Sequence, residues 1–512
     1  MRRVRVLALL MAALGAASCA VGPDYHTPPV RTPEKFTAAS ATQATAATPE
    51  PPIDFASWWR ALRDPELDSL VARAVKANPD VLIALDRLQA ARTYEFGTYS
   101  AVLPIATASI GGGKGTGSDL GRGRASQQMV SAETGTPLKQ VNTLGGFDAI
   151  WQLDVFGKYR RGIEAAHYDT QAAAAARNAV LVAVIADVAG AYVELRGLQV
   201  RSAVLHSAIG ALQESLDIVA ERFERGITNE LDVKLATREL ETLKAQVAPL
   251  DAAVDAAQYR IATLLGQYPE DLVQELSPRG VVPAVPPSVQ AGMPVELLRR
   301  RPDIQEAERE LAAANARIGF AAGSLFPSIF VSGATGFEQQ GWGSAPKMGQ
   351  HIWALGPAAV WPLLDFGALD AQLQIADLQT RAQLVNYKKT IQGAVQEVDT
   401  VLSAYAAEQT SLVSLGEALA ASERAVTLAT ERYNRGLTDF LNVIDAERAE
   451  YLIEDQYAQT QTAACVEFVA LYRSLGGGWQ NYQDLPPITT PLPAVVAAFR
   501  EVFTRNNALK DP

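Results

Sequence analysis

The feature that most constrains this chain is a string of residues that it carries twice. RFERGITNELDVKLATR occupies 222–238 and RYNRGLTDFLNVIDAER occupies 432–448, an offset of 210 residues. Internal repetition decides an architecture before any single motif does, because each copy is one structural unit. The extent of the duplication is therefore the first question.

The duplication reaches far beyond the two strings. NPDVLIALDRLQAAR at 78–92 matches RPDIQEAERELAAAN at 301–315 with an offset of 223, and WQLDVFG at 151–157 matches WPLLDFG at 361–367 with an offset of 210. The first copy is thus 13 residues longer, and the surplus falls in GGGKGTGSDLGRGRASQQ, which is typical of a flexible loop. We infer two homologous halves joined by a linker: 64–277, 294–477 and the linker 278–293.

Both halves predict the same order of elements, two strands followed by a long helical hairpin. The strands are expected at about 104–112, 145–156, 326–336 and 352–364, and the hairpins at 157–266 and 367–476. Alternating apolar and polar residues in FDAIWQLDVF fit a strand between lipid and water. Heptads of leucine and valine predict coiled-coil limbs, with a kink or break at Pro249. Gly226 and Gly436 are expected to reverse the chain at the two tips.

The N-terminus, MRRVRVLALLMAALGAASCA, has a basic head, a short apolar stretch and small residues before Cys19. This pattern predicts an export signal at 1–18 that is too short to span a membrane. The residues before Cys19 resemble a lipoprotein processing box, so we expect Cys19 to be acylated and to lead an extended, lipid-anchored segment at 19–63. The alternative is an ordinary signal peptide with an incidental cysteine. Ala20 suits delivery to the outer membrane of a Gram-negative bacterium.

Composition argues against several functions. The net charge of −11 disfavours nucleic acid as a partner. The four histidines are scattered without ligand spacing, and there is no nucleophile elbow. Cys465 is expected to be a small buried helix residue. We therefore expect no catalysis, no cofactor and no metal.

A membrane crossing by this chain would have to use strands. The best apolar run after the signal, 179–193, is short and is interrupted by Asp187, whereas a spanning helix needs about 20 apolar residues. Four strands cannot close a barrel, which needs at least about 8, and open edges in lipid are prohibitively costly. Three chains would supply twelve strands. The expected fold class is a mixed α/β membrane protein with four strands per chain.

Several motifs together carry a resemblance to a known family. They are CAVGPDYHTP, MPVELLRRRPDIQEAE (293–308), WPLLDFG, the two repeated strings and LYRSLGGGW (471–479). The chain resembles outer-membrane efflux channels of the TolC-like outer-membrane factor family, in its lipoprotein subgroup. The resemblance implies a homotrimer with a 12-stranded outer-membrane barrel above a coiled-coil tunnel in the periplasm. The linker and the C-terminal periplasmic segment, 478–512, would form an equatorial collar.

The resemblance also implies a role and partners. The chain would be the passive exit duct of a tripartite, RND-type efflux pump, conducting drugs or other toxic small molecules, with a periplasmic adaptor protein and an inner-membrane transporter. A duct for type I protein secretion is an alternative within the same fold. A coiled-coil structural lipoprotein with no pore is the alternative from another class, although the amphipathic strand at 147–156 argues against it.

Two sets of site residues follow from the resemblance. A periplasmic gate is implied at Leu441, Asp445 and Arg448, of which Asp445 and Arg448 are spaced i,i+3 and can pair on one helix face. Leu235 replaces the aspartate in the first hairpin, so only the second would carry an acidic ring. The alternative is an ordinary solvated ion pair, which contributes little.

The hairpin tips are the candidate contacts for the adaptor. The residues are Arg225, Gly226, Ile227, Thr228, Arg435, Gly436, Leu437 and Thr438. Glycine and threonine can simply make the turn, but an exposed apolar side chain at a tip also suits docking.

Overall fold

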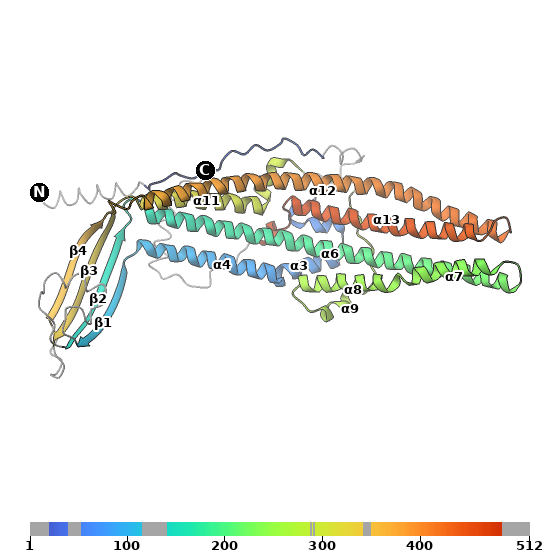
Figure 1. The fold of residues 1–512 in the computed structure, drawn as a ribbon, viewed down its shortest axis with the longest axis horizontal. Helices are drawn as coiled ribbons and strands as arrows, with labels where there is room; N and C mark the ends of the chain where they lie inside the picture. The colour runs from blue at the N-terminus through green and yellow to red at the C-terminus, as the bar shows by residue number, and fades with distance from the viewer. Residues whose placement is uncertain are drawn as a thin grey trace.

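The computed structural model describes residues 20–38, 53–114, 141–286, 289, 292–340 and 350–483. It is a long rod with a sheet at one end, two helical hairpin tips at the other end and helices between them (Figure 1). The predicted signal at 1–18, Cys19, most of the longer glycine-rich loop and the residues after 483 lie outside the described residues.

The sheet has four antiparallel strands in the order β1-β2-β3-β4. They are β1 (Ile105–Lys114), β2 (Val141–Leu153), β3 (Ser328–Gln340) and β4 (Gln350–Val360). Each half contributes one strand hairpin, and the pairing of β2 with β3 joins the halves. All four strands extend two to four residues further into the loops than expected, because ladder hydrogen bonds need only backbone groups. The expected ends of β2 at 156 and of β4 at 364 are wrong, since the strands end at Leu153 and Val360. Asp154 and Asp365 follow those ends and accept hydrogen bonds from the first turns of α6 and α12. β1 and β4 are the outer strands.

The helices repeat the same order in both halves. The first half contains α3 (Pro65–Ala77), α4 (Pro79–Tyr99), α6 (Lys158–Glu224), α7 (Glu230–Lys244), α8 (Val247–Leu264) and α9 (Val273–Leu276). The second half contains α10 (Leu297–Arg300), α11 (Pro302–Gly323), α12 (Ala368–Asn434) and α13 (Leu441–Ser474). The matched Pro-Asp pairs start α4 and α11, where Pro79 and Pro302 hold the first helical position and their missing N–H groups cost nothing.

The two outgoing limbs are equally long, and the two return limbs differ. α6 and α12 have 67 residues each, so each is about 100 Å long at 1.5 Å per residue. The predicted break in the first return limb is confirmed, since α7 ends at Lys244 and α8 begins at Val247. Pro249 is the third residue of α8, where its N–H would have no partner within the helix. The second return limb, α13, is continuous.

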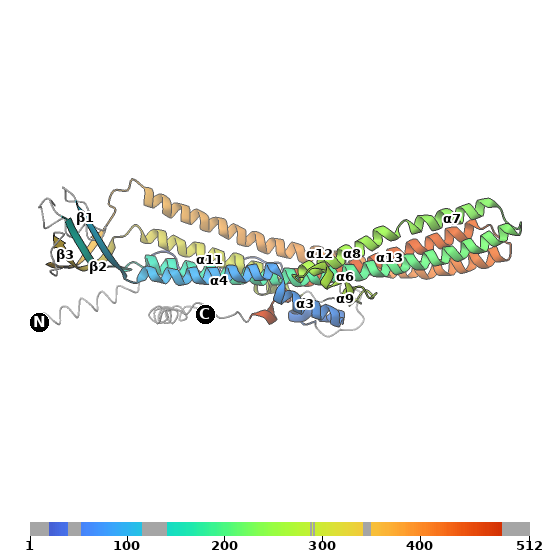
Figure 2. The ribbon, with the colours of Figure 1, turned by 90° about the horizontal axis from the view of Figure 1, so that it is seen from below.

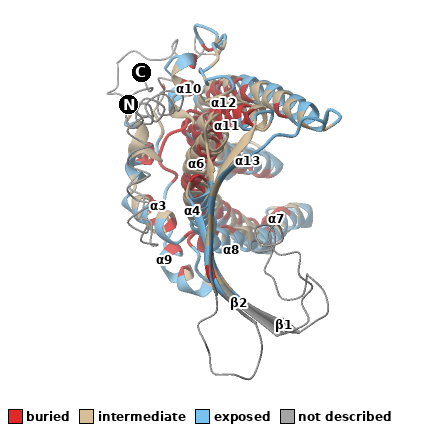
Figure 3. Cartoon of the chain, turned by 90° about the vertical axis from the view of Figure 1, so that its left-hand side faces the viewer, coloured by how far each residue is buried: buried red, intermediate tan, exposed pale blue. Residues whose placement is uncertain are grey.

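The core of the rod is built around α6. Side chains of α6 such as Leu181, Ile185 and Tyr192 are buried among residues of α3, α8, α11 and α13. Figure 3 shows these buried positions gathered inside the bundle and the exposed ones around it. Among the described helices only α6 is long and apolar enough to cross a membrane by length and composition, and 61% of its most apolar window is buried inside the protein.

Short elements thicken the middle of the rod (Figure 2). They are the 3-10 helices η1 (Phe55–Leu62), η3 (Pro269–Asp271), η4 (Pro294–Glu296) and η5 (Gln480–Tyr482), together with α3, α9 and α10; η2 (Ser100–Val102) lies next to β1. Trp58 is buried and stacks on Tyr472, with ring centroids 5.6 Å apart. Arg196 donates to the Pro278 carbonyl at 2.8 Å, which fastens the start of the proline-rich linker to α6.

The segment 20–38 is extended and runs along the helices as a strap. The Val21 N–H donates to the Phe156 carbonyl at 3.1 Å, where β2 gives way to α6. Further along, the Tyr25 hydroxyl donates to Glu308 of α11 at 2.9 Å. The Ala38 N–H donates to Asp399 of α12 at 3.1 Å. The strap therefore begins beside the sheet and ends towards the middle of the rod.

Candidate functional site at the hairpin tips

The repeated string folds into the same turn twice. Gly226 and Gly436 both have φ of +72°, a left-handed conformation that glycine adopts without strain. The Gly226 N–H donates to the Phe223 carbonyl at 2.8 Å, and the Ile227 N–H donates to the Arg222 carbonyl at 2.9 Å. In the second tip the equivalent bonds measure 2.9 and 3.0 Å. This hydrogen-bond pattern satisfies the last carbonyls of α6 and α12.

Both turns present an apolar side chain to solvent. Ile227 is 65% exposed and Leu437 is 64% exposed, although such side chains are usually buried. Arg225 and Arg435 flank them and are exposed, and Arg225 pairs with Glu221. Each predicted tip residue thus lies at the far end of the rod from the sheet.

The two tips pack against each other through a cluster whose central residue, Phe440, was not expected from the sequence. Phe440 and Tyr433 are buried with ring centroids 5.2 Å apart. They share a cluster with Val219 of α6 and Ile444 of α13. The Arg222 guanidinium lies 4.5 Å from the Tyr433 ring centroid, a favourable cation–π geometry. The sequence did carry a signal for this packing, because the apolar Phe440 stands where the first copy of the repeated string has the charged Glu230.

The predicted gate residues lie in the first two turns of α13. Leu441, Asp445 and Arg448 are all exposed. Within the described part of the chain, Asp445 and Arg448 form no ion pair with each other. Instead, Arg448 Nε lies 3.7 Å from Glu239 Oε1 of α7, whose side chain is almost wholly buried. The second hairpin is therefore tied to the first by a charge pair that its own sequence does not reveal.

A second carboxylate links the hairpins beside the gate residues. The Ser215 hydroxyl of α6 donates to Glu447 Oε1 at 2.5 Å, and Glu447 Oε2 is buried without a hydrogen-bond partner among the described residues. Burial raises the pKa of Glu447, the Ser215 hydrogen bond lowers it, and Glu450 raises it again. Burial and Glu423 raise the pKa of Glu450 in the same way.

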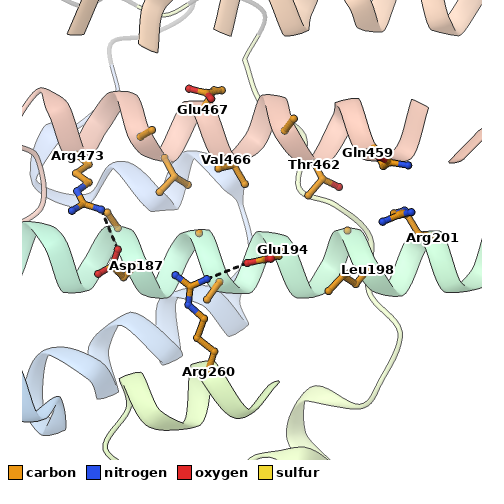
Figure 4. A pocket seen from close by; sticks show the side chains of 17 residues that line it. Asp187, Glu194, Leu198, Arg201, Arg260, Gln459, Thr462, Val466, Glu467 and Arg473 are labelled. Atoms are coloured by element: carbon orange, nitrogen blue, oxygen red, sulfur yellow. Dashed lines mark hydrogen bonds and ion pairs between the residues drawn. The ribbon is translucent and has the colours of Figure 1, made fainter. Parts of the chain in front are cut away.

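Further from the tips, α6, α8 and α13 enclose a cleft of about 600 Å³. Figure 4 shows it bordered by ion pairs, among them Arg473 with Asp187 at 3.1 Å and Arg260 with Glu194 at 3.3 Å. The charges of opposite sign are paired across the helices, which fastens them together. Among the described residues, no group of His, Cys, Asp or Glu is arranged to hold a metal ion.

Comparison with known proteins gives this architecture a family. The model of the family "Outer membrane efflux protein" matches residues 70–267 and 293–477. The chain is 30% identical to the toluene efflux pump outer membrane protein TtgC of Pseudomonas putida, over 93% of this chain and 96% of that protein. It is 29% identical to nodulation protein T of Rhizobium leguminosarum, over 90% of this chain and 95% of that protein.

Solved structures agree. The outer-membrane channel OprN superposes with a TM-score of 0.80 at 36% identity, covering 90% of this chain and all of that one. The open state of the Neisseria gonorrhoeae MtrE outer membrane channel gives a TM-score of 0.76 at 27% identity, covering 91% of this chain and all of the channel. The fold is that of trimeric outer-membrane channels in which three chains complete one barrel above a helical tunnel. The alternative of a scaffold without a pore is set aside. This chain belongs to the outer membrane efflux protein family.

Proposed function

We propose that the trimer is the exit duct of a tripartite pump that expels small toxic molecules. The observation that supports this role best is the separation of the sheet from the hairpin tips by limbs of 67 residues, or about 100 Å. A protein of that shape connects the outer membrane to partners deep in the periplasm. Related proteins are named as outer-membrane components of toluene and antibiotic efflux pumps.

The tips dock the adaptor of the pump. Ile227 and Leu437 present one apolar side chain each at the two turns, with the exposed Leu231 and Leu441 nearby in the sequence. Three chains present six copies of the turn side chains in a ring. Exposure of these grouped apolar side chains to water is unfavourable, and a bound partner would bury them. Gly226 and Gly436 keep the two turns the same, so the ring presents nearly equivalent contacts.

The aperture is narrowed by Leu441, Asp445 and Arg448. Three copies of α13 bring three aspartates and three arginines together around the axis, where Asp445 can accept from the arginine of a partner subunit. Glu239 holds Arg448 from behind through the 3.7 Å contact. The gate therefore opens when the inter-subunit hydrogen bonds break.

Cys19 carries the lipid anchor. Ala20 packs on Gly157, so closely that a Cβ on this glycine would lie 2.6 Å from the Ala20 Cα. Gly157 directly precedes α6 and follows the end of β2 by four residues, so Ala20, the first described residue, lies at the sheet end of the rod. A lipid anchor on the residue before Ala20 suits this placement. Mass spectrometry of the mature protein tests this, and a free Cys19 thiol would contradict it.

Efflux measurements in the native host test the proposed function. Deleting the gene should raise the accumulation of ethidium and the sensitivity to toluene, and the full chain should restore both. Leu437→Asp should fail to restore them although the trimer still assembles, whereas Leu437→Met, which keeps an apolar side chain of similar volume, should succeed. Unchanged accumulation after deletion would contradict the role of exit duct.

A further inference from the structure

The cleft between α6, α8 and α13 lies on the face of α6 that points away from α3. Tyr192 of α6 marks the covered face, because its hydroxyl donates to Asp64, the residue that caps the start of α3, at 2.6 Å. Gly190 and Glu194 line the cleft. Each is two residues from Tyr192, which is about 200° around a helix of 3.6 residues per turn. The cleft and α3 are therefore on opposite sides of the rod.

The order of the helices shows which of them enclose the cleft. α6 packs against both α8 and α13, and α13 packs against α12. Within one chain α6 and α13 are thus the inner pair, and α8 and α12 lie at the edges, where neighbouring subunits of the trimer meet the chain. The cleft runs along the inner pair, so it stays open in the assembled trimer. Because α3 and the other short elements thicken the outside of the tunnel, the cleft opens into its lumen.

Small residues give the cleft its depth. A Cβ on Gly197 of α6 would lie 2.3 Å from the Thr462 hydroxyl of α13, so this glycine lets the two helices approach closely. At Gly190 no atom lies within 4 Å of a Cβ, so the space above that residue is open. Leu198 and Val466 add apolar surface to the lining. A volume of about 600 Å³ lies within the range of sites that hold drug-sized molecules.

The charges of the cleft leave one carboxylate unpaired. Each arginine of the lining has an acidic partner, and the pairs are Arg473 with Asp187, Arg260 with Glu194 and Arg201 with Asp455. Glu467 lines the cleft on the α13 side (Figure 4) and, among the described residues, forms no hydrogen bond or ion pair. Burial and the nearby Glu408 raise the pKa of Glu467, because neither stabilises its charged form. A bound cation would supply that stabilisation.

We propose that this cleft is a binding site in the tunnel wall for amphipathic organic cations of drug size. The apolar part of the molecule fills the space above Gly190, against Leu198 and Val466, and its positive charge is attracted by Glu467. Such binding is weak enough to be reversible, as a conducting pathway requires. The proposal rests on the exit duct proposed above and names a class of molecule that the duct holds in transit.

A binding titration with ethidium, an aromatic cation, tests the charge. The purified trimer in nanodiscs should bind ethidium saturably, as followed by fluorescence anisotropy. Glu467→Gln keeps the shape of the side chain and removes its charge, so it should weaken binding about tenfold. The matched control is Glu417→Gln, an exposed position of α12 outside the cleft, which should leave binding unchanged. The anionic dye fluorescein should not bind.

A pair of glycine substitutions tests the place. Gly190→Leu puts a side chain into the open space of the cleft and should abolish saturable ethidium binding. It should not lower the unfolding temperature, because a Cβ there meets no atom within 4 Å and leucine favours a helix more than glycine does. Gly210→Leu is the matched control, since Gly210 is also in α6 with no atom within 4 Å of a Cβ but lies outside the cleft. It should bind ethidium as the wild type does.

The outcomes separate the binding site from the duct. A wild-type trimer that binds no ethidium, or equal binding by Gly190→Leu and Gly210→Leu, would overturn the site and leave the exit duct standing. Equal binding of ethidium and fluorescein would overturn the preference for cations. Unchanged ethidium accumulation after deletion of the gene would overturn the exit duct, whatever the titrations show.

Discussion

The first and second hairpins end in the same turn and differ in what surrounds it. Gly226 and Gly436 share φ and hydrogen bonds, but Phe440 is buried against the first hairpin while the equivalent Glu230 is exposed. Duplication has kept the backbone turn, which depends on local hydrogen bonds, and has changed the side chains that decide what each tip touches. Only the second tip carries the buried ring of Phe440 and the charged residues of the proposed gate, Asp445 and Arg448.

The largest loss of tip stability should come from removing the buried ring of Phe440. Phe440→Ala deletes a fully buried ring, a change that costs about 3–5 kcal/mol in a packed core, and the second tip should lose hydrogen-exchange protection by an amount of that size. Glu230→Ala removes an exposed side chain and should change protection by less than about 0.5 kcal/mol. Similar losses in the two variants would show that the tips are not packed as described.

The turns themselves should respond equally. Gly226→Ala and Gly436→Ala each force a side chain into a left-handed conformation, which costs about 1–2 kcal/mol. No atom lies within 4 Å of a Cβ at either position, so strain and not crowding sets the loss. Unfolding of each tip, followed by hydrogen exchange, should show matching changes. A loss confined to one tip would mean that the turns are not equivalent.

The smallest effect should be the change in stability with pH that the Glu447 carboxyl causes. Burial raises its pKa above the ordinary value of 4.5, so the folded protein keeps a proton that the unfolded chain releases. The associated stability is complete below pH 4.5 and is lost as pH rises through the raised pKa. Contact between the hairpins should therefore tighten as pH falls from neutral.

Thermal unfolding measured across that pH range checks this prediction. Glu447→Gln should flatten the dependence and stabilise the tips at neutral pH, because the amide needs no proton to stay neutral. The exposed Glu417→Gln is the matched control and should leave the slope unchanged. A wild-type protein whose stability rises with pH would contradict the assignment.

The duplication, the turns and the hairpin lengths could be predicted from the sequence, because they rest on local spacing and on glycines at fixed places. The break near Pro249 was equally local, although it falls just before the proline, since a proline is tolerated in the first turn of the helix that follows. What could not be predicted joins residues far apart in the chain. The contacts of Glu239 with Arg448 and of Ser215 with Glu447 each span more than 200 residues.

The strap shows the same limit. Nothing in the local sequence around Tyr25 indicates that its hydroxyl meets Glu308, because that contact depends on how the strap lies across α11. The proposed pair of Asp445 and Arg448 followed from spacing along one helix. In the structure Arg448 pairs instead with Glu239 on the neighbouring hairpin. The buried carboxylate of Glu239 attracts the guanidinium more strongly than the exposed carboxylate of Asp445 does.

Single-channel conductance in planar bilayers tests the central claim most directly. Purified wild-type trimer should conduct poorly, and Asp445→Ala with Arg448→Ala should conduct far better, because the ring at the aperture is lost while the barrel is unchanged. Equal and measurable conductance in both proteins would show that the gate is not formed by these residues. No conductance from either protein, with the trimers demonstrably folded, would contradict the account of this chain as an exit duct.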